Sequence, residues 1–205
     1  MCTAGVSKVA SNRCFVSAKA ATPIRFAAPI VKKALVQLTL DPSVHALQFI
    51  PSAEVLGMPV QIDAIVVCRA DNKHYLDVIE ARKQHDLDEE GLILLALEQL
   101  GLAPLTVSPA DLRQQPYASN CCLVWNSRHL QVRASDKVRV LQALTEDGPM
   151  SLGRLAAETR WSPDPVGAIL SMACQDLVEI DLASRLLGPE TTIRRRVVAE
   201  DASNC

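Results

Sequence analysis

Two acidic residues have the types and spacing of side chains that could bind one divalent metal ion. Asp63 lies in an apolar segment rich in β-branched residues, and Glu80 and Arg82 lie in the next such segment. If the two segments pair as a hairpin, both carboxylates come to one end of a sheet. Mg²⁺ and Mn²⁺ take hard oxygen ligands, commonly one or two carboxylates together with substrate phosphate. The pattern therefore makes Asp63 and Glu80 candidate metal ligands.

The same residues also have a purely structural interpretation. An acid at a strand end, together with a surface ion pair between Glu80 and either Arg82 or Lys83, would produce the same spacing. On pattern alone the structural interpretation is the commoner one. The choice between the two interpretations therefore depends more on the elements around these residues than on the residues themselves.

The elements around them predict an α/β unit. Apolar residues recur at helical spacing up to residue 40, and Asp41-Pro42 ends that helix. Two β-branched segments separated by turn residues predict a pair of antiparallel strands. The expected order is helix, three strands, helix and strand, over residues 30–40, 44–50, 59–68, 74–81, 91–100 and 105–107. A further helical turn at 108–113 and a strand or helix at 121–125 follow.

A second unit is expected from about residue 135. Helical spacing predicts one helix around Val138 to Leu144, a second that Ser151 caps, and a third that begins at Ser162-Pro163-Asp164. Residues 178–182 and 191–196 then predict two strands. Three helices followed by a two-stranded wing predict a winged helix.

Read together, the two units resemble TnsA-type endonucleases, which are transposase subunits with a restriction-endonuclease-like domain and a C-terminal winged helix. The resemblance covers most of residues 20–197 and rests on spacing and element order. It is carried by Phe26 to Val44, Pro51, Asp63, Glu80-x-Arg82, Leu100-Gly101-Leu102, Leu105-Thr106-Val107 and Asp111-Leu112-Arg113. It implies a restriction-endonuclease-like mixed sheet flanked by helices over 25–132 and a winged helix over 135–197. The residues outside these units are expected to form a basic flexible arm over 1–24 and a tail over 198–205.

The resemblance also implies roles for the site residues. Asp63 and Glu80 match two acidic positions of the family, whereas Arg82 stands where the family has its catalytic lysine. The first helix has Ala27 and Val31 where a glutamate is usual. An arginine does not readily give up a proton and is a poor substitute for an adjustable ammonium. The resemblance therefore implies a nuclease fold whose cleavage, with Mg²⁺ or Mn²⁺ if active, is weak or lost.

An acid from elsewhere offers a contrary possibility. Glu54 or Asp77 could have moved into the site and restored its charge.

Basic residues supply a second candidate surface. The first 40 residues contain six cations and no acid, so this stretch is either a solvated tail or a segment that lies along phosphates. A transit peptide is a minor alternative. The wing is basic, whereas the third helix of the second unit is nearly uncharged, so DNA contact and protein docking are both open for that unit. The DNA-contact candidates are Lys19, Arg25, Lys32, Lys33, Arg185, Arg194, Arg195 and Arg196.

Composition excludes several other classes of function. The 205 residues are 49% hydrophobic, 21% charged and 3% aromatic, and no apolar run approaches the roughly 20 residues that a membrane helix needs. Few aromatics argue against a base-stacking surface. There is no G-x-S-x-G elbow and no phosphate-cradling glycine loop. Seven cysteines without a C-x-x-C pair favour reduced thiols in a cytoplasmic protein.

The leading expectation is a TnsA-like subunit that binds double-stranded DNA ends and partner proteins, namely the transposase and ATPase subunits of the same mobile element. Two alternatives stay open. One is a winged-helix transcriptional regulator with an α/β sensor domain, and the other is a structural adaptor that binds protein without DNA.

Overall fold

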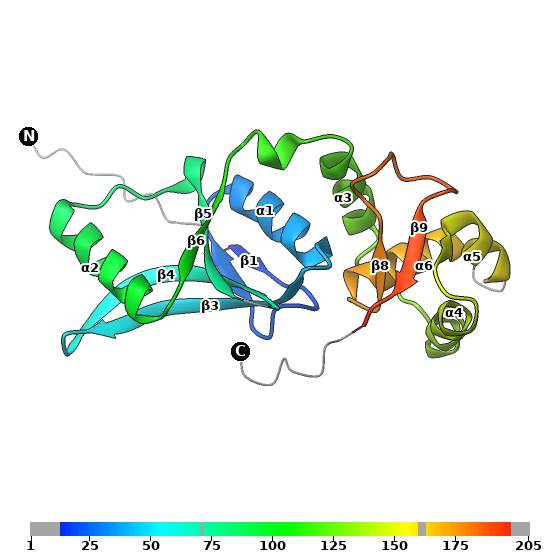
Figure 1. The fold of residues 1–205 in the computed structure, drawn as a ribbon, viewed down its shortest axis with the longest axis horizontal. Coiled ribbons are helices and arrows are strands. Elements are labelled where there is room, and N and C mark those ends of the chain that lie inside the picture. The colour runs from blue at the N-terminus through cyan, green and yellow to red at the C-terminus, as the bar shows by residue number, and fades with distance from the viewer. Residues whose placement is uncertain (1–12, 71, 160–162, 198–205) are drawn as a thin grey trace, which may run out of the picture.

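The computed structural model describes residues 13–70, 72–159 and 163–197. A four-stranded sheet with its helices occupies one part of the elongated molecule, and a helical unit with a small sheet occupies the other (Figure 1). Residues 1–12 and 198–205, which belong to the expected arm and tail, lie outside the described residues.

The four-stranded sheet has the order β3-β4-β5-β6. Strands β3 (Val44–Val55), β4 (Met58–Arg69) and β5 (Lys73–Val78) are antiparallel neighbours. Strand β6 (Ala103–Val107) runs parallel to β5, and helix α2 (Leu87–Gln99) lies in the connection between them. This is the expected α/β unit with a mixed sheet flanked by helices.

Alternation along β4 explains why helices cover both faces of the sheet. Successive side chains of a strand point to opposite faces. Ile65 and Val67 pack in the cluster that contains Leu35 of helix α1 (Pro29–Leu40), whereas Ala64 and Val66 pack with Leu97 of α2. A strand buried on both sides reads as a continuous apolar run, which is what residues 64–68 show.

Helix α2 begins earlier than its apolar spacing indicates. The carboxylate of Asp86 accepts a hydrogen bond from the backbone N–H of Glu89 at 2.8 Å, so the helix starts at Leu87 instead of Gly91. Three acids then stand in its first turn, where the helix dipole favours negative charge.

The segment before α1 is folded. Strands β1 (Arg13–Phe15) and β2 (Ile24–Phe26) pair antiparallel, and the ring of Phe15 stacks on that of Trp125 with centroids 5.3 Å apart. The expectation of a flexible arm over residues 1–24 is therefore corrected for residues 13–24, because the buried side chains of Phe15 and Ile24 anchor them to the core.

The second unit contains helices and a small sheet. Its helices are α4 (Ala134–Glu146), α5 (Leu152–Glu158) and α6 (Pro165–Cys174), and α3 (Tyr117–Asn126) precedes them. Its sheet has the order β7-β9-β8, formed by Met150–Ser151, Thr192–Arg195 and Val178–Ile180. Ser151 caps α5 as expected. The assignment of this unit as a winged helix stays a prediction.

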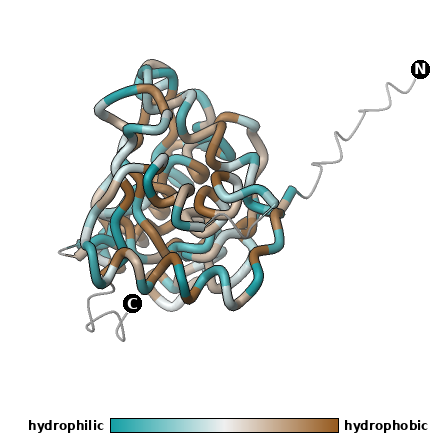
Figure 2. Tube along the Cα trace, turned by 90° about the vertical axis from the view of Figure 1, so that its right-hand side faces the viewer, coloured by the Kyte–Doolittle hydropathy of each residue, from teal (hydrophilic) through white to brown (hydrophobic). Residues whose placement is uncertain are grey.

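One hydrophobic cluster joins the two units. It contains Leu35 and Val67 from the first unit, Ile169 and Ile193 from the second, and Trp125 from α3, which lies at the junction. Seen along the long axis, hydrophobic stretches run through the middle of the trace (Figure 2). Among the described residues, no helix has the length and apolar character needed to cross a bilayer.

Candidate functional site

Asp63 lies at an irregularity in β4. The pairing between β3 and β4 shifts so that Ile62 and Asp63 together stand opposite Pro51. A proline has no N–H to donate to a ladder, so a bulge is the expected response. Asp63 adopts the left-handed backbone region with φ 45°, which costs on the order of 1–3 kcal/mol for a residue other than glycine.

Both carboxylate oxygens of Asp63 have donors. The Gln61 amide donates to Oδ1 at 2.6 Å, and the Lys83 ammonium lies 2.7 Å from Oδ2. Burial by itself would raise the pKa of Asp63, but the hydrogen bonds from Lys83 and Gln61 and the charges of Lys83 and Arg25 outweigh it and lower that pKa. Asp63 is therefore an ionised, paired carboxylate.

Glu80 is not on a strand. Strand β5 ends at Val78, and residues Ile79–Ala81 form the short 3₁₀ helix η1, in which Glu80 is exposed. The expectation that residues 74–81 form one strand is corrected for its last three residues. The consequence is that Asp63 and Glu80 do not occupy neighbouring strand positions.

Arg82 pairs with Asp77 of β5. Its Nε lies 2.8 Å from Oδ1, its Nη2 contacts Oδ2, and the Thr106 hydroxyl donates to Oδ2 at 3.2 Å. The hydrogen bond from Arg82 is the largest of the influences that hold the pKa of Asp77 below its usual range. Asp77 is thus engaged by a bidentate arginine, so the guanidinium of Arg82 is paired with Asp77.

The donor set around Asp63 does not fit a magnesium or manganese ion. Such an ion needs several oxygen ligands and negative charge, whereas the carboxylate of Asp63 has the Lys83 ammonium and the Gln61 amide as its neighbours, and both donate to it. Within residues 13–70, 72–159 and 163–197, no three acids, histidines or cysteines gather in a way that could hold a metal. Glu54 is an exposed residue near the far end of β3, opposite Pro59.

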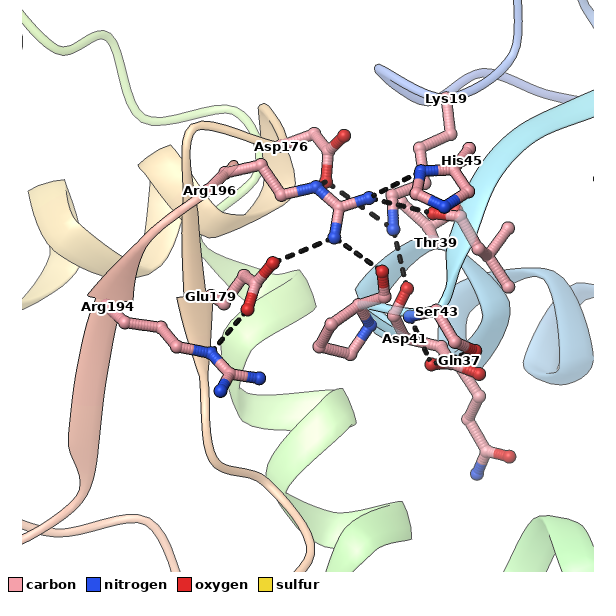
Figure 3. A network of polar contacts seen from close by, with 12 residues as sticks. Lys19, Gln37, Thr39, Asp41, Ser43, His45, Asp176, Glu179, Arg194 and Arg196 are labelled. Carbon is pink, nitrogen blue, oxygen red and sulfur yellow. Dashed lines mark hydrogen bonds and ion pairs between the residues drawn. The ribbon is translucent and has the colours of Figure 1, made fainter. Parts of the chain in front are cut away.

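Two of the expected DNA contacts are buried at the junction of the two units. The side chains of Lys19 and Arg196 are 2% and 4% exposed, respectively. Figure 3 shows both cations directed at a group of acids and carbonyls between α1 and β8. Neither side chain offers surface to a phosphate, so the expectation of DNA contact is corrected for these two residues.

Arg196 connects the last strand to the loop after α1. Its guanidinium donates to the carbonyls of Pro42 and Val44, the latter at 3.1 Å, and pairs with Glu179 at 2.8 Å and Asp176 at 3.4 Å. An arginine fork with five donors is suited to bridging several acceptors at once. No spacing in the sequence indicates the contacts with the two carbonyls, because Pro42 and Val44 are about 150 residues away from Arg196.

Lys19 takes part in the same network. Its ammonium donates to the carbonyl of Asp41 at 2.7 Å and lies 3.4 Å from the Asp176 carboxylate. Burial lowers the pKa of Lys19, and the charge of Asp176 only partly opposes that effect.

The other six candidate cations are exposed. Arg25 lies on β2, and Lys32 and Lys33 lie on α1. On β9, Arg194 pairs with Glu179, and Arg195 donates to the Thr145 hydroxyl at 2.7 Å. Arg185 lies in the connection between β8 and β9. The candidate cations thus form two groups, one on each unit.

A groove of about 690 Å³ opens between the units. The loop after α1, the segment around the cis Gln115-Pro116 bond, and the connection between β8 and β9 form its walls. Arg194 is among its lining residues.

Comparison with known families and with curated proteins found no match: no family model fits this chain, and no curated protein is significantly similar to it.

Proposed function

We propose that this chain is a TnsA-like subunit of a heteromeric transposase, which binds double-stranded DNA ends and partner transposition proteins and whose nuclease activity is weak or lost. One observation carries the proposal. Helix α1, antiparallel strands β3, β4 and β5, the α2 connection and parallel strand β6 follow each other along the chain, with Asp63 on the middle strand of the three. This is the order that we expect of a restriction-endonuclease-like core.

The altered site supports weak or lost cleavage. Water activation by a nuclease needs a metal ion or a positioned base, and the lysine position carries an arginine that binds Asp77. Glu80 stands in a turn, away from the strand position where a second ligand would face Asp63. If some activity remains, it requires Mg²⁺ or Mn²⁺.

DNA binding is proposed to be electrostatic and independent of sequence. In a winged helix the third helix commonly reads the major groove. Here α6 is buried over residues 167–174, which leaves little of it to enter a groove. Exposed cations on β9 and α1 could instead contact phosphates and release counterions.

The test is a titration of duplex DNA with the full chain at several salt concentrations. Each phosphate contact adds about 0.9 to the slope of log affinity against log salt. Arg195→Gln and Lys33→Gln are each expected to lower the slope by about 1 and to weaken binding several-fold. Lys73→Gln removes an exposed charge outside the proposed surface, so it serves as the matched control.

The outcomes separate the candidate functions. A smaller slope of log affinity against log salt in Arg195→Gln and Lys33→Gln, with the slope of Lys73→Gln unchanged, supports the proposal. Absence of duplex binding, with transposase and ATPase partners present or absent, would reject it. A sequence-specific footprint made by the isolated chain would favour a transcriptional regulator. Mn²⁺-dependent nicking that Asp63→Ala abolishes would show that cleavage survives.

A further inference from the structure

We infer that the ammonium of Lys83 takes the place of a divalent cation beside Asp63, so that this site functions without a bound metal ion. The inference rests on the proposed nuclease-like core, because only that core leads one to expect a metal at Asp63. It concerns a residue next to the expected catalytic position, Arg82.

The turn after β5 decides which cation reaches Asp63. Residues Ile79–Ala81 form η1, and the backbone N–H of Arg82 donates to the Ile79 carbonyl at 3.4 Å. Arg82 then points to Asp77 and Lys83 to Asp63. The ion pair that the sequence would assign to Arg82 or Lys83 with Glu80 is thus replaced by two pairs with acids of β4 and β5.

The Lys83 ammonium supplies the positive charge that a metal ion would otherwise supply to the Asp63 carboxylate. It lies 2.7 Å from Oδ2, and the Gln61 amide fills Oδ1. One positive charge balances one carboxylate, so no excess negative charge is left to attract a divalent ion. The nearby cation Arg25 adds to the positive potential at Asp63.

An ammonium differs from a metal in what it can do. It has three donors and no open coordination position, so it cannot polarise a bound water as Mg²⁺ does. Its side chain is 59% exposed, which leaves donors free to contact a phosphate oxygen. The site is therefore built to contact a phosphodiester directly and not to hydrolyse it.

The first experiment measures Mn²⁺ binding to the full chain by calorimetry, without DNA. We expect no saturable site with a dissociation constant below about 1 mM in the wild type, and no change in Asp63→Asn. A saturable site tighter than this limit that Asp63→Asn abolishes would overturn the inference.

The second experiment measures whether Mn²⁺ replaces the ammonium once that is removed. Lys83→Gln keeps a polar side chain but leaves Asp63 without a cation, and we expect its Tm to fall by roughly 1–4 °C. About 5 mM Mn²⁺ should restore part of that loss, while the wild type, Lys73→Gln and the double variant Asp63→Asn/Lys83→Gln should not respond. Equal responses of the wild type and Lys83→Gln to Mn²⁺ would contradict the replacement.

The third experiment measures whether DNA binding depends on Lys83 and on a metal ion. Duplex affinity should be the same in Mg²⁺ and in a chelator at matched ionic strength, and Lys83→Gln should weaken it by about tenfold. A chelator that abolishes binding overturns the inference but leaves the proposed function intact. Absence of duplex binding rejects the proposed function, whereas the Mn²⁺ measurements without DNA still decide the role of Lys83.

Discussion

At the scale of single residues, the adjacent cations Arg82 and Lys83 form ion pairs with two different acids of the candidate site. Arg82 pairs with Asp77, while Lys83 pairs with Asp63. Both acids are ionised, and neither pair is fully buried, since the two cations are 58% and 59% exposed. Pairs of this kind contribute modestly to stability and mainly direct which groups face outward.

The Asp77 pair gives a pH-dependent prediction. The pKa of Asp77 is lowered from 3.8, so its contribution to stability is fully present above that pH and is lost as the pH falls through the folded pKa. Asp77→Asn should therefore be less stable than the wild type at pH 6 to 7 by less than about 1 kcal/mol, because Arg82 is exposed.

Urea unfolding at pH 7 and at about pH 3 measures this effect. The difference between Asp77→Asn and the wild type should shrink at the lower pH. A difference that stays constant over this range would show that the Arg82 pair does not stabilise the ionised carboxylate.

At the scale of elements, β9 has two roles on its two sides. Arg195 is exposed on the strand, whereas Arg196, which follows the strand, is buried against the loop after α1. Because the side chains of neighbouring strand residues point to opposite sides, a run of three arginines cannot form one uniform phosphate-binding surface.

Arg196→Met is expected to destabilise the protein by about 3 kcal/mol. It removes one of the two cations that pair with Glu179 and with Asp176, and it removes the guanidinium that donates to two carbonyls at a buried junction. Arg195→Met on the same strand should change stability by less than about 0.5 kcal/mol. Chemical denaturation of the two variants provides the comparison. Equal effects would indicate that the junction network does not hold β9 in place.

At the scale of the whole molecule, the two units share a core and a polar network. The cluster that contains Leu35 and Val67 also contains Ile169 and Ile193, and Lys19 and Arg196 bridge the same junction. Two independently stable domains would be expected to have separate cores.

Unfolding should therefore be a single cooperative transition. We expect calorimetric and van't Hoff enthalpies to agree, and far-ultraviolet circular dichroism to coincide with tryptophan fluorescence. Two resolved transitions in the wild type would contradict the coupling of the two units. Two transitions that appear only in Arg196→Met would show that the coupling depends on the junction.

Local patterns in the sequence predicted most of the helices and strands. Helical spacing predicted α1 and α4, the cap at Ser151 predicted α5, and β-branched runs predicted β4 and most of β5. These features depend on neighbours within a few residues, which is the range that periodicity and capping describe. The sequence also indicated the acids Asp63 and Glu80, and the cations Arg82 and Lys83 that follow Glu80.

The tertiary structure alone decided which charges meet. Asp63 finds Lys83 because β5 ends at Val78 and a turn follows, and Arg196 finds Pro42 and Val44 across about 150 residues. A charge on a strand or turn has many partners of opposite sign available, and the one it takes depends on packing and burial at long range. Sequence spacing therefore indicated the acids and cations of this protein, while its packed junction and the bulge at Asp63 determined what each of them does.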